Sequence, residues 1–311
     1  MNTPITQSKA WQALQDALGE VSYRKEGSGY QYLAIFKEAK MANYFYLPYG
    51  PVTKDRRSFE NAIKSLKNLA SKKNVSFIRI EPQDPETIDY FPEKTVKSHD
   101  LNPKETWVLD LKGTDEELKQ KLPSRLLRYY RNMSKNGLSI KTSHDPEDIK
   151  YLTKLQNSLA KEKGINTFSE KYLKTELAQS FSTLYYAQHR DPETGKETIV
   201  AAGLVFDDKT TRYNLQGAQN EIGRKLHATG ILTIQLILDA KAKDLKTFDF
   251  WGIAPEGAPE NHPWAGFTNF KKTFAGHEVK YAGTYDIILD PTRYRLYQSL
   301  RRINRFVRRN R

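Results

Sequence analysis

The chain has 311 residues, of which 38% are hydrophobic and 12% aromatic, so it can bury substantial cores, and its length favours two domains. With 18 Tyr, 14 Phe and 4 Trp it is too rich in aromatic residues for a disordered protein. Its 50 Lys and Arg against 37 Asp and Glu leave a formal net charge of +13, which indicates polyanionic partners such as nucleic acid or an anionic membrane.

Several patterns that mark common enzyme classes are absent from the sequence. Cysteine does not occur, which excludes disulfides, cysteine-based zinc sites and a cysteine nucleophile. HExxH, Gly-x-x-x-x-Gly-Lys and Gly-x-Ser-x-Gly motifs are also missing, so metalloprotease, NTPase and serine hydrolase interpretations lose their support and no metal site is expected. The sequence has neither a membrane-spanning apolar run nor a signal-peptide pattern, so we expect a soluble, cytoplasmic protein.

The N-terminal third alternates between helical and strand patterns. Ser8 is placed to cap a helix whose apolar face includes Trp11, a pattern typical of core packing. In the run YLPYGPV, Gly50 either lets a ligand approach the backbone closely or simply forms the turn that ends a strand. The expected strands are residues 21–23, 30–37, 41–47 and 75–80, and the expected helix is residues 56–73.

A change of pattern near residue 112 marks the expected domain boundary. TWVLDL, at residues 106–111, predicts a strand; Thr114 and Glu117 form a capping box for the next helix, and Pro123 suits the first turn of another. We expect a first domain of residues 1–112 completed by 283–311, and a second domain of residues 113–282.

The helix after Pro123 is strongly basic. Arg125, Arg128 and Arg131 recur every three residues, and no carboxylate lies between Lys119 and His144. This run predicts either a surface that contacts phosphate or tRNA, or an ordinary solvated face.

Downstream, the pattern predicts a second α/β unit that leads into the candidate site. A buried strand at residues 248–251 opens into a Gly/Pro loop, and the helix expected at residues 266–274 carries Lys271 and Lys272 beside phenylalanines. Loops at strand ends often hold functional residues, so this loop and helix form the candidate site. Before it we expect helices at residues 145–163 and up to about 179, strands at 182–189, 198–206 and 212–217, and a helix at 230–243.

The C-terminal tail from Arg293 contains eight Arg and no acidic residue. Tyr297, Leu300, Ile303 and Val307 recur at helical spacing, which predicts a basic amphipathic helix. Such a helix either binds a polyanion or docks on the first domain with a solvated basic side.

Six segments in chain order carry a resemblance to a known family. They are ITQSKAW, YLPYGPV, TWVLDL, the Arg-rich helix ending in NGL, ATGILTIQLILDAKAKDLKTFDFWG, and GFTNFKKTFAGHEVKYAGTYD. Together they resemble the motifs of the FemABX aminoacyltransferases, including the MurM-type enzymes, and they span nearly the whole chain. The resemblance implies an α/β (α+β) fold of two GNAT-like domains, in the compact form without a helical arm.

The resemblance also implies an activity. FemABX enzymes move an amino acid, here of the Gly, Ala or Ser type, from aminoacyl-tRNA to the stem-peptide amine of a peptidoglycan precursor. The implied partners are aminoacyl-tRNA, on the second domain, and UDP-MurNAc-pentapeptide or the lipid-linked precursor, on the first. Aminoacyl-tRNA is a co-substrate, so no cofactor is expected. The protein is expected to be a monomer. Its net charge and basic C-terminal helix, rather than the resemblance, predict peripheral contact with the inner membrane surface.

Residue roles follow from the matching motifs. Lys271, with Phe270 before it, matches the catalytic FK pair, and a lysine against aromatic side chains is suited to stabilising an oxyanion. Arg125, Arg128, Arg131, Arg301 and Arg305 are the candidates for tRNA or phosphate contact. The candidates for substrate binding are Trp11, Tyr49, Gly50, Tyr172, Gly217, Asp249, Trp251 and Gly252.

Some features depart from the family or leave the function open. Gln15 and Glu20 stand where many relatives have the Lys-LGW segment, so the acceptor phosphates are held differently, and Asp249 and His262 remain alternatives for a general base. One rival function is that of a coenzyme A-dependent acyltransferase, although its pyrophosphate loop motif is missing. Another is a non-catalytic protein that binds RNA or a membrane surface.

Overall fold

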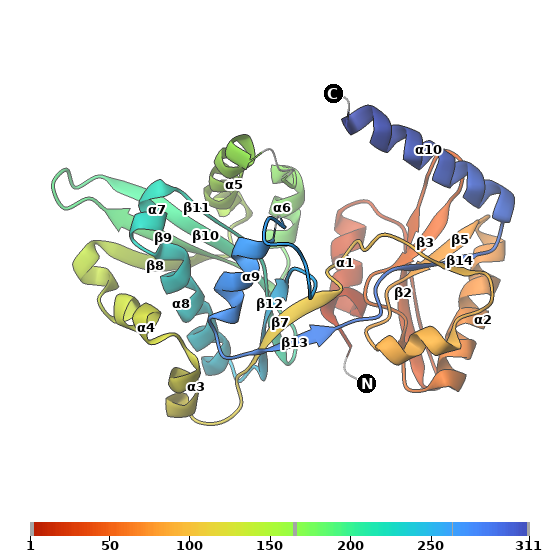
Figure 1. Cartoon of the computed structure of the whole chain (residues 1–311), viewed down its shortest axis with the longest axis horizontal. Coiled ribbons are helices and arrows are strands. Elements are labelled where there is room, and N and C mark those ends of the chain that lie inside the picture. Colours follow the sequence, from red (N-terminus) through yellow and green to blue (C-terminus); the bar gives the residue numbers. More distant parts are fainter. Residues whose placement is uncertain (1–2, 164–166, 263, 310–311) are drawn as a thin grey trace. The chain divides into compact units, whose positions relative to one another are not determined.

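The computed structural model describes residues 3–163, 167–262 and 264–309, and the chain forms two compact units. The first comprises Met1–Lys104 and Lys280–Arg311, and the second comprises Glu105–Val279. Each unit is a mixed α/β structure built on one sheet (Figure 1).

The first unit contains a sheet in the order β1-β2-β3-β5-β14-β6, with β4 paired to β2. Asp55 caps α2 in a capping box with Ser58, and the apolar stripe of that helix is buried against the sheet through Phe59, Ile63 and Leu66. The elements are η1 (Ile5–Gln7), α1 (Lys9–Ala17), β1 (Ser22–Gly27), β2 (Tyr30–Lys37), β3 (Tyr44–Leu47), β4 (Val52–Thr53), α2 (Arg56–Lys72), β5 (Phe77–Ile80), η2 (Pro85–Tyr90), β6 (Thr95–Lys97), β14 (Tyr285–Ile288) and α10 (Pro291–Arg309).

The C-terminal elements of the chain complete this first unit. β14 lies between β5 and β6, so β14 and α10, dark blue in Figure 1, lie among the red and orange N-terminal elements. Arg79 on β5 donates two hydrogen bonds to the Asp286 carboxylate on β14, at 2.7 and 2.8 Å, and both residues are buried. The Tyr294 hydroxyl of α10 donates to the same carboxylate at 2.9 Å, which anchors the helix to the sheet.

The second unit has the strand order β13-β7-β12-β11-β10-β9-β8, and α8 packs on β9, β10 and β11. The capping box predicted at Thr114 and Glu117 is confirmed. The elements are β7 (Glu105–Asp110), α3 (Asp115–Lys121), α4 (Ser124–Arg131), η3 (Met133–Asn136), β8 (Leu138–Ser143), η4 (Pro146–Ile149), α5 (Lys150–Lys163), α6 (Glu170–Leu177), β9 (Ser182–Arg190), β10 (Glu197–Asp207), β11 (Thr211–Gln219), α7 (Glu221–Lys225), α8 (Ala228–Ala242), β12 (Thr247–Gly252), α9 (Ala265–Lys272) and β13 (His277–Lys280).

One strand lies in a different sheet from the one we expected. We placed the TWVLDL strand in the first domain, which gave boundaries after residues 112 and 282, but β7 pairs with β12 and β13 in the second sheet. The compact units accordingly divide after Lys104 and after Val279. Hydrophobic pattern identifies a strand but not its partner, because pairing is set by distant residues.

The second sheet opens at one point, between β11 and β12. These two strands pair in parallel from Thr211 opposite Thr247 to Tyr213 opposite Asp249. Beyond that pair β11 stays with β10, whereas β12 stays with β7 through a register irregularity after Asp249, and Gly252 lies opposite Thr106. The opening starts at the strand end that the sequence marks as the candidate site.

Candidate active site

Asp249 lies where β11 and β12 diverge. Its carboxylate accepts a hydrogen bond from the backbone N–H of Trp251 at 2.7 Å, and its side chain is almost completely buried, with the residue 3% exposed. Trp251 has a φ of 66°, in the left-handed region that a bulky residue rarely adopts. The backbone at Trp251 is therefore strained, and the hydrogen bond to Asp249 stabilises it. Backbone strain of this kind is often found at functional sites.

Lys271 reaches the same turn from the last part of α9. Its ammonium donates a hydrogen bond to the Gly252 carbonyl oxygen at 2.5 Å, so the lysine side chain is fixed one residue beyond Trp251. Burial lowers the pKa of Lys271 to about 8, although the charge of Asp249 acts in the opposite direction. Burial raises the pKa of Asp249 to about 7, opposed by the Trp251 hydrogen bond, the Lys271 charge and Thr106. Both groups thus titrate near neutral pH.

Helix α9 is positioned by contacts on its inner side. The Thr268 hydroxyl accepts a hydrogen bond from the Ala254 N–H at 2.8 Å, which ties the helix to the segment after β12. The Phe270 ring lies 5.5 Å from the buried Phe274 ring, so Phe270 packs on the apolar core of the second unit. Lys272 is exposed instead, with its ammonium 5.6 Å from the Trp107 ring centre.

A second polar group lies on the β11 side and was not predicted from the sequence. Glu176 on α6 is buried and accepts a hydrogen bond from Gln216 on β11 at 3.4 Å, and Gln156 on α5 donates to Gln216 at 3.0 Å. Burial raises the pKa of Glu176 to about 7, opposed by a hydrogen bond from Tyr172. The spacing Leu173, Glu176, Leu177 on one helix face would have indicated a buried carboxyl.

The structure brings one predicted substrate-binding residue, Tyr172, into contact with this group, and a second, Gly217, is the sequence neighbour of Gln216. Tyr172 is in contact with Glu176, and its ring stacks on Phe168 with the ring centres 5.0 Å apart. Gly217 follows Gln216 on the part of β11 beyond the opening, where it is exposed. With Asp249, Trp251 and Gly252, five of the eight predicted substrate-binding residues therefore lie in the second unit.

Trp11, Tyr49 and Gly50 belong to the first unit. Trp11 is buried on α1, and the Tyr49 hydroxyl donates to the Pro103 carbonyl at 2.9 Å. A Cβ on Gly50 would lie 2.5 Å from Gln7, whose amide donates to the Pro48 carbonyl at 2.8 Å. The N-terminal segment thus packs on the YLPYGPV turn, and Gly50 is needed for that packing.

The basic helix α4 carries its arginines on the surface. Arg125 donates to the Tyr129 hydroxyl at 2.9 Å, and Arg128 lies 5.7 Å from the centre of the Tyr129 ring. That ring stacks on His227 with the ring centres 4.5 Å apart. Together with exposed Arg131, these residues form a cationic and aromatic surface on α4.

The remaining predicted polar residues are two arginines of α10 and the loop histidine, and no contact described for them involves Asp249 or Lys271. Arg301 on α10 contacts the His99 ring, and the side chain of Arg305 lies outside the described residues. His262 accepts a hydrogen bond from the Trp264 N–H at 3.1 Å, in the loop before α9.

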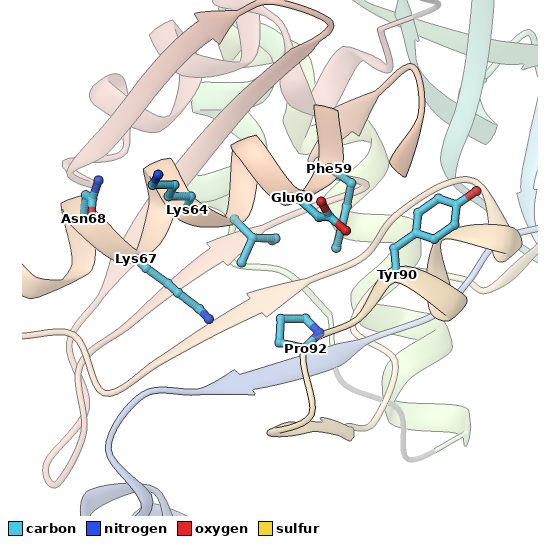
Figure 2. Close-up of a pocket in the computed structure, with 8 residues that line it drawn as sticks. Phe59, Glu60, Lys64, Lys67, Asn68, Tyr90 and Pro92 are labelled. Carbon is cyan, nitrogen blue, oxygen red and sulfur yellow. The ribbon is translucent and has the colours of Figure 1, made fainter. Parts of the chain in front are cut away.

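A pocket of about 330 Å³ lies in the first unit between α2 and the segment after η2, as Figure 2 shows. None of the predicted site residues lines it, and its position offers no catalytic group apart from surface charges. The lining residues are Phe59, Glu60, Ile63, Lys64, Lys67, Asn68, Tyr90 and Pro92.

Comparison with known proteins finds a family match over part of the chain and a fold match over nearly all of it. A model of the FemAB family matches residues 171–302. A crystal structure of FemX shares the fold with a TM-score of 0.82 at 15% identity, over 95% of this chain and 94% of that chain. No curated protein gives a significant sequence match.

Two further solved structures share the fold at lower similarity. L-PGS from Bacillus licheniformis matches with a TM-score of 0.59 at 14% identity, over 99% of both chains. A tandem GNAT protein from the clavulanic acid biosynthesis pathway matches with a TM-score of 0.51 at 13% identity, over 86% of this chain and 82% of that chain. The predicted fold of two GNAT-like domains is confirmed, and within this FemX-like fold residues 171–302 match the FemAB family model.

Proposed function

We propose that this FemABX aminoacyltransferase moves an amino acid of the Gly, Ala or Ser type from aminoacyl-tRNA to the stem-peptide amine of a peptidoglycan precursor. The observation that carries the proposal is the position of Lys271 beside the Asp249 turn, where the second sheet opens. A partly buried cation held at a strand opening suits a reaction in which negative charge develops on a carbonyl oxygen.

The proposed reaction is acyl transfer from an ester to an amine. The acceptor nitrogen attacks the aminoacyl carbonyl carbon, giving a tetrahedral intermediate whose carbonyl oxygen carries a negative charge. The attacking group is the neutral amine, and its nitrogen is positively charged in the intermediate. The ester C–O bond then breaks, and the tRNA ribose oxygen leaves with the proton that this nitrogen gives up. The ester is already activated, so the protein chiefly aligns the partners and stabilises the oxyanion, and no cofactor takes part.

We assign the oxyanion role to Lys271. With a pKa of about 8 its ammonium is largely charged at neutral pH, and in its partly buried position the charge acts more strongly than it would in water. Phe270, the residue before Lys271, packs on the apolar core and fixes that side of α9. In the described structure the Gly252 carbonyl holds the ammonium in place, and we propose that the lysine exchanges this contact for the oxyanion.

Asp249 has two roles consistent with its environment. As a carboxylate it raises the pKa of Lys271 and so keeps the lysine charged. With its own pKa near 7 it can also accept a proton near neutral pH, so it is a candidate for the general base. We propose that the α4 surface of Arg125, Arg128 and Arg131 contacts the tRNA phosphates, since it has exposed guanidinium groups.

A glycerophospholipid is a second acceptor class for the same chemistry. A solved structure named as the C-terminal domain of a putative lysylphosphatidylglycerol synthetase from Agrobacterium fabrum shares the fold of this chain. The match has a TM-score of 0.61 at 14% identity and covers 95% of this chain and 91% of that chain. In that case a lipid hydroxyl would replace the peptide amine as the nucleophile.

The test uses the purified full chain and a panel of tRNAs charged with different amino acids. Each is incubated with UDP-MurNAc-pentapeptide, with the lipid-linked precursor, or with phosphatidylglycerol vesicles, and the products are weighed by mass spectrometry. We expect a precursor whose mass has increased by one amino-acid residue, formed only in the presence of charged tRNA. If only the lipid gains mass, the second acceptor class is correct; if no acceptor gains mass with any donor, the proposed function is wrong.

A further inference from the structure

Helix α10 has one face that docks on the first unit. Tyr294 is buried, and its hydroxyl donates to Asp286. The Tyr297 ring lies 5.1 Å from the Phe77 ring and 5.9 Å from the Tyr44 ring, so one tyrosine per turn fastens the helix to the sheet. We expected Tyr297 to share a face with Leu300 and Ile303, but in the structure Tyr297 packs inward while those two residues are exposed.

The opposite face of α10 carries apolar side chains in solvent. Leu296 lies two positions after Tyr294, which is roughly 200° around a helix. Leu296, Leu300 and Ile303 recur at intervals of four and three residues, and they are 45%, 37% and 58% exposed. Their spacing forms a continuous stripe along about two turns, which we call the α10 stripe.

Positive charge surrounds the α10 stripe. Residues 291–311 contain eight Arg and no Asp or Glu. Arg293, Arg295 and Arg302 are exposed, and the only carboxylate ion pair described for them joins Arg293 to Asp290, at 3.6 Å. The surface is therefore apolar along its middle and cationic on its flanks.

We propose that the α10 stripe is a docking surface for an anionic phospholipid bilayer, with the leucines and isoleucine entering the interface and the arginines contacting lipid phosphates. A helix with an apolar face flanked by basic residues lies in the plane of such an interface, and each arginine near the surface adds attraction to anionic lipid. In the described part of the chain no helix is long and apolar enough to span a membrane, so the contact is peripheral.

The stripe itself favours lipid over two other occupants. RNA would be bound by the arginines and would gain little from exposed leucines, since phosphate contacts dominate such affinity. A second copy of this chain docked through the same face would bring the exposed Arg293, Arg295 and Arg302 of both copies together, which is unfavourable. An anionic bilayer satisfies both the apolar stripe and the uncompensated positive charge, and this inference does not depend on the proposed transferase activity.

The test measures co-sedimentation of the full chain with vesicles of phosphatidylcholine alone or with one quarter phosphatidylglycerol. The stripe variant Leu296→Gln, Leu300→Gln, Ile303→Gln keeps every charge and uses a residue that favours helix. The matched control, Val21→Gln, Met41→Gln, Ile88→Gln, removes three exposed apolar side chains of the same unit elsewhere on its surface. Circular dichroism and thermal melting check that both variants are folded.

We expect the wild-type chain and the control to bind the anionic vesicles and to bind neutral vesicles weakly. The stripe variant should lose about tenfold or more in affinity for the anionic vesicles, because three apolar side chains no longer enter the interface. The proposal is overturned if the wild-type chain does not bind anionic vesicles, or if the folded stripe variant binds as tightly as wild type. It is also overturned if the stripe variant loses tRNA binding but keeps vesicle binding, or if it turns a dimeric wild type into a monomer.

Discussion

Two pairs of buried charges, one in each unit, differ in how fully their charges are compensated. In the first unit Arg79 meets Asp286 through two hydrogen bonds, and Tyr294 occupies a further position on that carboxylate. At the opening of the second sheet, Asp249 and Lys271 are also withdrawn from water, but burial moves their pKa values to about 7 and about 8. Fully matched charges hold a sheet together, whereas incompletely compensated charges remain able to change protonation.

The second unit contains a matched pair of its own, so the contrast does not reflect the units as such. Arg212 donates to Asp207 at 2.7 and 2.6 Å, and it also donates to the Leu236 carbonyl at 2.9 Å. That pair ties β10 and β11 to α8 just before the strand opening, where Arg212 still lies opposite Phe248. The difference therefore separates charges that serve the fold from charges that serve the site.

The largest effect expected from this comparison is on stability. Arg79→Met leaves the Asp286 carboxylate buried without its cation, and we expect the free energy of unfolding to fall by about 3–5 kcal/mol. Urea denaturation of the variant and wild type measures the change. Replacing both partners, with Arg79→Met and Asp286→Leu, should recover much of the loss; a loss below about 1 kcal/mol for the single variant would contradict a structural role for this pair.

A smaller and pH-dependent effect is expected for Asp249. Its pKa in the folded state, about 7, is above the value of about 3.9 expected in the unfolded chain, so its contribution to stability is present below pH 4 and is lost as the pH rises to 7. Asp249→Asn cannot ionise and should lack this loss. We therefore expect the free energy of unfolding of the variant, minus that of wild type, to be larger at pH 8 than at pH 5 by more than roughly 1 kcal/mol. Urea denaturation of both proteins at the two pH values measures this difference.

The same substitution should affect turnover in a pH-dependent way. Without the Asp249 charge, which raises the pKa of Lys271, that pKa falls further below 8, so less of the lysine is charged at pH 8 than at pH 6.5. The loss of aminoacyl transfer by Asp249→Asn should therefore be greater at pH 8. If the loss of activity is the same at both pH values, Asp249 does not act by keeping Lys271 charged.

The smallest effect is expected on the β11 side of the opening. Glu176→Gln preserves the shape of a buried side chain but weakens its hydrogen bonds to Tyr172 and Gln216. If Tyr172 contacts substrate, we expect KM to rise about 2- to 10-fold with little change in kcat. A change of that size corresponds to the free energy of one hydrogen bond. Tyr172→Phe is the matched variant. If KM is unchanged in both Glu176→Gln and Tyr172→Phe, these two residues do not contribute to substrate binding.

Local features of the fold were readable from the sequence, and long-range ones were not. The helix caps at Ser8 and Thr114 depend on residues three positions apart, and both are confirmed. The sheet that receives β7 depends on β12, more than a hundred residues away in the sequence, so periodicity could not reveal it.

The candidate site shows the same division. Asp249 and Lys271 stood out separately, one at a strand end and one in a family motif, but their mutual influence follows from the bend at Trp251 and the position of α9. Glu176 was overlooked because a charged residue in a helix usually faces solvent. For α10 the helix was predicted, but which of its faces docks was not, because the tyrosines are recognised by Phe77 and Asp286 on strands far along the chain.

The most direct test of the account compares aminoacyl transfer by Lys271→Met and Lys272→Met under identical conditions. Lys271 is held at the Gly252 turn, whereas Lys272 is exposed over Trp107, so the two variants remove the same charge from adjacent positions of α9. We predict that Lys271→Met lowers kcat about 100- to 1000-fold with little change in KM, as expected for loss of an oxyanion-stabilising donor. Lys272→Met should keep nearly full activity. Equal and small losses in the two folded variants would contradict the claim that Lys271 stabilises the transition state.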